Sequence, residues 1–181
     1  MHGREIVLGV TGGIAAYKAA ALASQLVQAG AGVTAILTAA AEEFIGRATF
    51  EALTGRRVLS QIFDEPGYPL GAHIELADKA QLLIVAPATA NFMAKAANGL
   101  ADDLLSTLYL SFTYPVVVAP AMNCEMWEKP AVQRNVQQLR ADGVHFVDPE
   151  EGWLSCRKRG IGRMAAPEKI MAAINELLNL Q

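Results

Sequence analysis

The segment of this chain with the most chemical potential is the octet at residues 120–127, Pro-Ala-Met-Asn-Cys-Glu-Met-Trp. It follows an apolar run that we expect to be a buried strand, and open α/β sheets bind ligands at the carboxyl ends of their strands. Met and Trp are costly to expose, whereas the Asn123 amide can both donate and accept hydrogen bonds. The octet therefore favours a mostly apolar pocket with one polar group. Equally, Asn123 could cap a short helix from which Met126 and Trp127 pack inward.

Small and polar residues also follow the other predicted strands. Residues 9–14, Gly-Val-Thr-Gly-Gly-Ile, would let a phosphate or a ring approach the backbone at the start of a helix. Their spacing is not GxGxxG, so the dinucleotide signal is poor and a simple tight turn stays open. Thr38 could reach a phosphate at the same sheet edge. Residues 87–91, Pro-Ala-Thr-Ala-Asn, suit a flat heterocycle, although Asn91 could instead cap the next helix.

Two residues are candidates for proton transfer. His73 ends an irregular loop just before a predicted strand, where catalytic residues are common, although a lone His is more often an ordinary surface or core residue. Cys156 precedes Arg157, Lys158 and Arg159, whose charges would lower the pKa of the thiol and could hold a phosphate. The alternative for this segment is a solvated basic loop. Asp102 and Asp103 are expected to be helix N-terminal charges rather than catalysts.

The elements that must position these residues alternate along the chain. Continuous apolar runs predict strands at residues 6–10, 33–38, 82–86, 115–119 and 144–147. Between and after them we predict helices at residues 14–28, 39–54, 88–97, 102–112, 130–141 and 167–180, with irregular segments at 56–72 and 148–166. This alternation predicts an α/β fold, a doubly wound parallel sheet in a flavodoxin/Rossmann-like three-layer domain that spans residues 1–181.

Composition excludes several classes of function. The chain is 52% hydrophobic and 18% charged, so it has ample material for a core and is not disordered. A net charge of −3 without a basic block argues against nucleic-acid binding, and no apolar run reaches the ~18 residues that a membrane span needs. Two cysteines and three scattered histidines predict neither a disulfide framework nor a metal site. The amino terminus lacks signal-peptide features, so we expect a cytoplasmic protein.

Taken in this order, the segments resemble the homo-oligomeric flavin-containing cysteine decarboxylase family, and most of all its phosphopantothenoylcysteine decarboxylases, including the amino-terminal half of the bifunctional coenzyme A biosynthesis protein. The resemblance covers essentially the whole chain, and the octet together with His73 is its most specific part. Because no second domain follows in this sequence, we expect the ligase half of the bifunctional relatives to be absent. The matching segments are residues 10–18, 73–76, 87–91 with Lys95, 101–105, 120–127 and 152–164.

The resemblance implies an FMN cofactor and active sites formed between the subunits of a homotrimer, which is sometimes assembled into a dodecamer. It implies that His73 is the active-site base and that Asn123 holds the substrate carboxylate, with Met122 and Met126 in the same substrate site. Residues 148–166 become a flap that covers the substrate and carries Cys156. The implied FMN-binding residues are Gly13, Thr38, Ala88, Thr89, Ala90, Asn91 and Ala121.

The implied reaction is the FMN-dependent decarboxylation of 4′-phosphopantothenoylcysteine to 4′-phosphopantetheine in coenzyme A biosynthesis. Oxidation to a thioaldehyde creates an electron sink, CO2 leaves, and the ene-thiol is reduced again with Cys156 as the proton donor. Asn123 can orient a carboxylate without a full positive charge, which would stabilise the carboxylate against the loss of CO2. The flap departs from the family, because it reads Ser155-Cys156-Arg157 where Ala-Cys-Gly is usual, and Arg disfavours the positive φ that Gly allows.

Two other functions stay open at this point. A peptidyl-cysteine decarboxylase, which modifies the C-terminus of a peptide, would share the FMN, the histidine and the asparagine motif. A non-catalytic, FMN-binding regulatory subunit would have lost a catalytic residue or gained an acidic tail. This chain keeps His73, Asn123 and Cys156, so the second alternative ranks low. Flavin prenyltransferases share the fold, but the His73 and Asn123 motifs argue against them.

Overall fold

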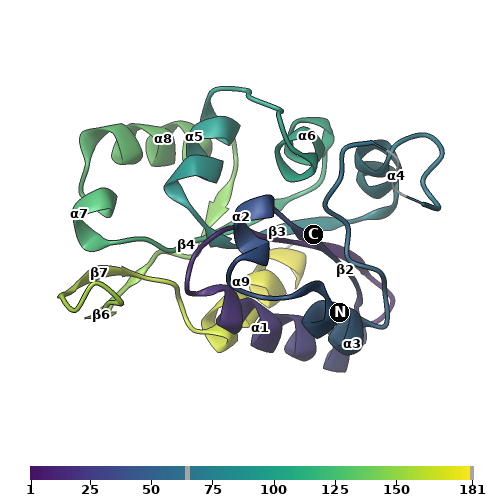
Figure 1. The fold of residues 1–181 in the computed structure, drawn as a ribbon, viewed down its shortest axis with the longest axis horizontal. Helices are drawn as coiled ribbons and strands as arrows, with labels where there is room; N and C mark the ends of the chain where they lie inside the picture. The colour runs from purple at the N-terminus through teal and green to yellow at the C-terminus, as the bar shows by residue number, and fades with distance from the viewer. Residues whose placement is uncertain (64–65, 180–181) are drawn as a thin grey trace.

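A single parallel sheet forms the centre of the structure, a computed structural model that describes residues 1–63 and 66–179. Its strand order is β2-β1-β3-β4-β5 (Figure 1), the flavodoxin-like order in which the direction of winding reverses between β1 and β3. The predicted doubly wound α/β fold is therefore confirmed. The strands are β1 (Glu5–Val10), β2 (Gly32–Leu37), β3 (Leu82–Ala88), β4 (Val116–Pro120) and β5 (His145–Phe146).

Alternate strand residues face two separate cores. In β1, Ile6 and Leu8 belong to one apolar cluster and Val7 to the other, as the two-residue period of a strand requires. Gly9 shares the face of Val7, and a Cβ atom on it would collide with the Leu105 side chain, so the glycine lets a helix approach the sheet closely. Burial on both faces is why the strand sequences are continuously apolar.

Helices cover both faces of the sheet, which makes three layers (Figure 1). In the described part of the chain, none of them is both long and apolar enough to cross a bilayer. On one face lie α1 (Ala16–Gln28), α3 (Arg47–Thr54) and α9 (Pro167–Asn179), with the short α2 (Ala39–Glu42) after β2. On the other face lie α4 (Ala72–Lys79), α5 (Ala90–Ala97), α6 (Leu104–Ser111) and α8 (Pro130–Ala141).

Two helical predictions need correction. The predicted helix at residues 39–54 is divided into α2 and α3, because Gly46 adopts an extended conformation at the start of α3. Gly55 ends α3 with a φ of 65°, as predicted. His73 does not lie in a loop but in the first turn of α4, which Gly71 starts with a φ of 98°. Burial of Leu76 and an ion pair between Glu75 and Lys79 one turn apart stabilise this helix.

The irregular segment predicted at residues 148–166 contains an antiparallel hairpin, β6 (Glu150–Trp153) and β7 (Arg159–Arg163). The hairpin lies beside α7 (Cys124–Trp127), away from the main sheet (Figure 1). Beyond it, Met164 is buried, and its carbonyl oxygen accepts a hydrogen bond of 2.7 Å from the Lys18 ammonium. The base of the hairpin is therefore anchored to the core through α1.

Candidate active site

A cavity of about 420 Å³ lies where the carboxyl ends of β1, β2 and β3 converge. Thr11 and Gly12 follow β1, Thr38 follows β2, and Thr89 follows β3, and all four line this cavity. It therefore lies at the β1/β3 switch point, where doubly wound sheets bind their ligands. The remaining lining residues are Ala39, Ala40, Ala90, Asn91, Phe92, Lys95, Asp103 and Met126.

The backbone around this cavity is suited to a flat, anionic ligand. Thr11 Oγ1 donates to the Pro87 carbonyl at 2.6 Å and accepts from the Thr89 amide at 3.0 Å, so the loops after β1 and β3 are tied together. A Cβ atom on Gly12 would lie 2.8 Å from the Ala40 carbonyl carbon, whereas one on Gly13 would meet only Thr89 Cγ2, at 3.9 Å. No side chain caps α1 at Ala15, so the positive end of its dipole is left for an anion, although the Ala16 and Lys18 amides already donate to the Gly13 and Ala15 carbonyls.

A charged network forms one wall of the cavity. Lys95 Nζ lies 2.6 Å from Asp102 Oδ1 and 2.7 Å from Asp103 Oδ2. Burial opposes ionisation of Asp103, yet hydrogen bonds from Lys95 and Ser106 keep the pKa of its carboxyl below the ordinary value. Burial also acts to lower the pKa of Lys95, but its hydrogen bonds to the two carboxylates raise that pKa overall. Asp103 lies at the N-terminus of α6 as predicted, where it caps the helix, but its place at the cavity with Lys95 was missed.

A sequence signal for Lys95 did exist. Asn91 and Lys95 are four residues apart on α5, so they share one face of the helix, and both line the cavity.

Asn123 uses its side chain in two ways. Its Oδ1 accepts a hydrogen bond of 2.7 Å from the Glu125 amide and caps α7, which confirms the capping interpretation. Within the described ranges its Nδ2 group has no partner, so it is free to donate to a ligand. Trp127 packs against the core as expected, but Met126 is 46% exposed and lines the cavity instead of packing inward.

The residues predicted to bind a cofactor divide into two groups. Thr38, Thr89, Ala90 and Asn91 line the cavity, while Gly13, Ala88 and Ala121 do not. Ala88 is buried in β3, and its carbonyl oxygen accepts a hydrogen bond of 3.1 Å from the Ala121 amide, which holds the start of the octet against the sheet. The alternative that Asn91 caps its helix is wrong, because Thr89 caps α5.

His73 lies far from the octet. It helps to line a different cavity, of about 620 Å³, beside the loop that leads into α4. Its Nδ1 atom is buried and has no hydrogen-bond partner within the described residues. In Figure 1, α4 and α7 lie at opposite ends of the molecule, so one chain does not bring His73 to Asn123.

The turn between β6 and β7 exposes Cys156. Leu154 accepts a hydrogen bond of 2.9 Å from the Arg157 amide and donates one of 2.8 Å to the Lys158 carbonyl, which closes the turn. Arg157 has a φ of 63° and is the one non-glycine residue with positive φ in the described chain. Arg157 therefore adopts the positive φ that an arginine was expected to disfavour, at a cost of roughly 1 kcal/mol.

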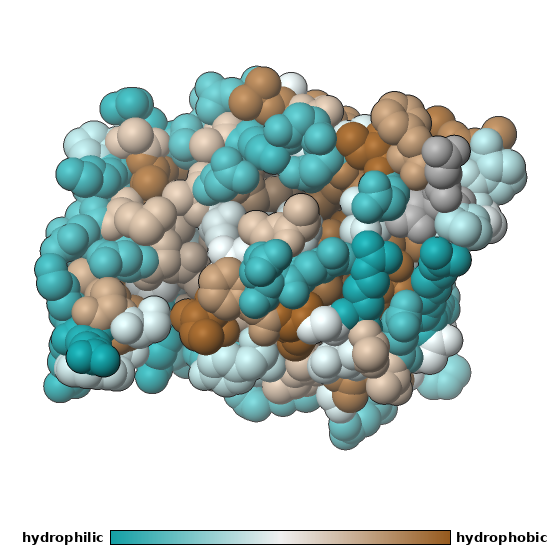
Figure 2. Space-filling view, in the orientation of Figure 1, coloured by the Kyte–Doolittle hydropathy of each residue, from teal (hydrophilic) through white to brown (hydrophobic). Residues whose placement is uncertain are grey.

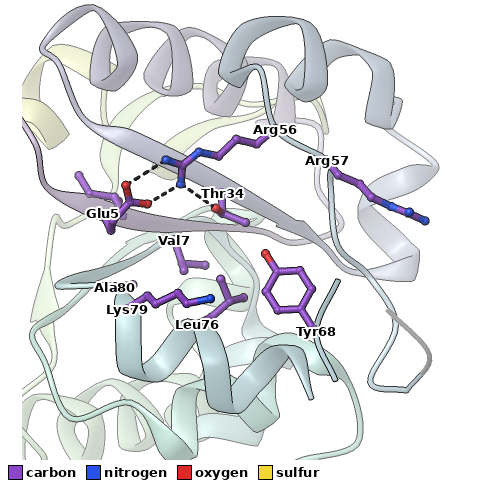
Figure 3. Close-up of a pocket in the computed structure, with 10 residues that line it drawn as sticks. Glu5, Val7, Thr34, Arg56, Arg57, Tyr68, Leu76, Lys79 and Ala80 are labelled. Carbon is purple, nitrogen blue, oxygen red and sulfur yellow. Dashed lines mark hydrogen bonds and ion pairs between the residues drawn. The ribbon is translucent and has the colours of Figure 1, made fainter. Parts of the chain in front are cut away.

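A further cavity, of about 370 Å³, lies near the amino ends of the strands (Figure 3). The Arg56 guanidinium hydrogen-bonds both oxygens of the Glu5 carboxylate and lies 3.2 Å from Thr34 Oγ1. The hydrogen bonds from Arg56 keep the pKa of Glu5 below its usual value. This ion pair joins β1 to the segment after α3 and lies at the amino ends of the strands, opposite the switch point.

Among residues 1–63 and 66–179, no three His, Cys, Asp or Glu side chains are grouped to hold a metal ion.

Comparison with known proteins gives matches over nearly the whole chain. The family model described as Flavoprotein matches residues 1–179. The coenzyme A biosynthesis bifunctional protein CoaBC of Bacillus subtilis (strain 168) is 49% identical over 171 residues, which are 94% of this chain and 42% of that protein. The chain thus spans less than half the length of this curated relative.

Two solved structures are similar throughout. The FMN-dependent cysteine decarboxylase SpaF is 36% identical with a TM-score of 0.83, and the match covers 94% of each chain. A cysteine-to-serine mutant of PPC decarboxylase, complexed with pantothenoylaminoethenethiol, is 28% identical with a TM-score of 0.88, and the match covers 97% of this chain and 98% of the other.

Proposed function

This chain belongs to the Flavoprotein family, and from that premise we propose that it binds FMN and decarboxylates 4′-phosphopantothenoylcysteine to 4′-phosphopantetheine in coenzyme A biosynthesis. The observation that carries the proposal is the convergence of Thr11, Gly12, Thr38 and Thr89 on one cavity at the switch point. SpaF is described as an FMN-dependent cysteine decarboxylase and CoaBC as a coenzyme A biosynthesis protein, which supports this cofactor and this substrate class.

The residues around the cavity fit FMN. The open space at Gly13 and the uncapped start of α1 suit the phosphate, while Thr38, Thr89, Ala90 and Asn91 offer small and polar surfaces to a flat ring. Ala88 and Ala121 support this wall through their backbone hydrogen bond. When bound, FMN supplies a reversible two-electron oxidation of the substrate's cysteine moiety, without which the carboxylate has no electron sink.

Asn123 orients the substrate carboxylate in this proposal. Its Nδ2 group is a neutral donor, so it fixes the carboxylate without stabilising its charge against the loss of CO2. Met122 and Met126 provide apolar surface that excludes water from the reacting carbon. The cap from Oδ1 to the Glu125 amide holds the donor in a single orientation.

His73 and Cys156 move the protons. His73 acts as the base, and because its Nδ1 is buried, Nε2 is the nitrogen that accepts the proton. Cys156 holds a proton at Sγ and gives it to the product carbon after CO2 has left. Its exposure on a turn suits a residue that reaches a substrate from a flap, residues 148–166.

A homotrimer, with a dodecamer assembled from trimers as its larger form, would complete the site. Because His73 and Asn123 lie at opposite ends of one chain, each site would take His73 of the partner subunit. Exposed apolar residues support this arrangement at both ends: Phe63 and Leu70 lie before α4, and Ile14 and Tyr17 lie near the switch point. Figure 2 shows apolar residues exposed between polar ones on the side of the molecule that faces the viewer in Figure 1. Two different patches that meet head to tail form a ring when the rotation between neighbouring subunits closes. We propose a cytoplasmic enzyme with no nucleic-acid or membrane partner, in which residues 1–181 form one flavoprotein decarboxylase domain.

The test is the product mass after purified protein, FMN and 4′-phosphopantothenoylcysteine are mixed. Loss of CO2 alone supports the complete reaction, and a Cys156→Ser variant should lose CO2 plus two hydrogens, because the ene-thiol then lacks its proton donor. The ethenethiol bound to a cysteine-to-serine mutant of PPC decarboxylase is a compound of this kind. No reaction with this substrate, but loss of mass from a peptide that ends in cysteine, would instead identify a peptidyl-cysteine decarboxylase.

A further inference from the structure

One face of β7 fits closely against the octet. A Cβ atom on Gly160 would lie 2.8 Å from Cys124 Cβ and 3.1 Å from its Sγ, and one on Gly162 would collide with the Met122 carbonyl oxygen. Lys158 forms an ion pair with Glu125. Residues 158, 160 and 162 alternate along the chain, so one side of the strand faces residues 122, 124 and 125 throughout.

The position of this strand is fixed at both ends. The Met122 amide donates a hydrogen bond of 2.9 Å to the Gly162 carbonyl, and the octet is itself held to β3 by the bond from Ala121 to Ala88. At the other end of β7, the two hydrogen bonds of Leu154 close the turn that carries Cys156. The contact of β7 with the octet therefore determines where the Cys156 thiol stands relative to Asn123.

We propose that Gly160 is a positioning residue, which seats the hairpin on Cys124 and so places Cys156 for proton delivery. The inference rests on the proposed function. In the step concerned, the S–H bond of Cys156 breaks and a C–H bond forms on the product, after which the thiolate regains a proton from water. The electron pair for this C–H bond is the one that the departing CO2 leaves in the ene-thiolate. The two-electron equivalent removed from the substrate before CO2 left then returns to the carbon that carries the sulfur, which completes the reduction.

A Gly160→Ala substitution should unseat the hairpin. Two Cβ atoms at 2.8 Å are well inside the ~3.5–4.0 Å of a normal carbon–carbon contact, and neither atom can turn away, because both are attached directly to the backbone. A Cys124→Gly substitution removes the opposing Cβ and should make room for the added methyl group. Gly152→Ala is the matched control: Gly152 pairs with Gly160 in the same hairpin, but the atoms nearest to its Cβ, at 3.1–3.2 Å, belong to the movable side chain of Arg163.

The first readout needs neither cofactor nor substrate. In protein without FMN, we expect Gly160→Ala to speed alkylation of Cys124 by N-ethylmaleimide at least about fivefold, because overpacking of a tight contact shifts equilibria by such factors. Cys156, already exposed, serves as the internal reference. Hydrogen exchange at the Met122 amide should also be faster in Gly160→Ala and should return to the wild-type rate in the Cys124→Gly/Gly160→Ala variant.

The second readout is the ratio of ene-thiol to saturated thiol in the product. We expect Gly160→Ala to raise this ratio with little loss of CO2 release, Gly152→Ala to leave it unchanged, and Cys124→Gly/Gly160→Ala to restore it. The inference would be overturned if the ratio of ene-thiol to saturated thiol is unchanged in Gly160→Ala. It would also be overturned if Cys124→Gly/Gly160→Ala restores the wild-type hydrogen exchange at Met122 but not the wild-type product ratio. If Gly160→Ala does not fold, Lys158→Glu replaces it in both readouts, because this substitution breaks the ion pair with Glu125. Lys158→Glu/Glu125→Lys, which restores the pair with reversed charges, is then the rescue variant. Absence of CO2 from the wild-type protein would refute the proposed function, and unaltered alkylation and exchange would separately refute the seating of the hairpin.

Discussion

At the scale of single residues, several side chains of the proposed site have two roles, because each also caps a helix. Asn123 caps α7 with its oxygen and leaves its amide nitrogen free. Thr38 and Thr89 cap α2 and α5 and also line the cavity. Because helix caps lie where strands end and helices begin, they lie at the same sheet edge as the ligand. A capping role is therefore no argument against a functional role here.

His73→Asn should abolish decarboxylation while FMN stays bound. Asn cannot accept a proton at neutral pH, and loss of a general base ordinarily lowers the rate by about 100-fold or more. CO2 release and the flavin absorbance of the purified protein measure the two effects. His145→Asn is the control, since His145 is exposed at the edge strand β5. Turnover near the wild-type rate in His73→Asn would remove His73 from the mechanism.

At the scale of elements, Asp103 links α6 to α5. It forms a capping box with Ser106 and an ion pair with Lys95. Asp103→Ala should lower the free energy of unfolding by about 1–2 kcal/mol through the lost cap alone. Asp103→Asn keeps the cap and loses the charge, so comparing the two variants in urea separates these contributions.

The contribution of Asp103 should also depend on pH. Its pKa is lower in the folded protein than in the unfolded chain, so the stabilisation is present above the unfolded pKa, roughly 4, and is lost as the pH falls through the folded pKa. The stability difference between wild type and Asp103→Asn should therefore be largest at neutral pH and should shrink in acid. Urea unfolding at pH 7 and pH 3 measures it. A difference that is equal at both pH values would contradict the assignment.

Arg157→Gly should stabilise the hairpin turn. Glycine adopts a φ of 63° without the strain of a side chain, although its more flexible unfolded chain offsets part of the gain, which leaves at most about 1 kcal/mol. Thermal unfolding and hydrogen exchange at residues 154–158 measure the effect. Arg159→Gly, in extended β7, should act in the opposite direction. Destabilisation by Arg157→Gly would mean that the Arg157 side chain stabilises the turn.

At the scale of the whole molecule, the two halves of the proposed site lie at opposite ends of one chain (Figure 1). The proposed ring of subunits would bring the α4 end of one chain to the switch point of the next, and exposed apolar residues occur at both places. Assembly of the subunits would then also complete the site. Loss of the oligomer should therefore abolish activity without unfolding the chain.

Mixing two inactive variants tests this arrangement. His73→Asn and Asn123→Ala should each be inactive alone, but unfolding and refolding them together at equal amounts should restore about a quarter of the sites, those with both groups intact. The CO2 release rate of the refolded mixture measures the effect. The same variants refolded separately and then mixed are the control. No activity in the refolded mixture would mean that His73 and Asn123 do not meet across an interface.

The sequence by itself determined the sheet, its parallel winding, the stop at Gly55 and the polar residues that line the switch point. These features depend on local properties: continuous apolar runs, helix caps and glycine conformations that a single segment specifies. It also predicted that Asn123 caps a helix, and the structure confirms this cap.

Only the tertiary structure decided the rest. The glycines of residues 148–166 argued for a loop, yet they form a strand because Gly160 and Gly162 must approach the octet, a contact between segments distant in the chain. His73 belongs to a helix, and its separation from Asn123 depends on strand order rather than on any local pattern. Local sequence specifies which elements form, but the distances between their side chains are set by how the elements pack, which no single segment encodes.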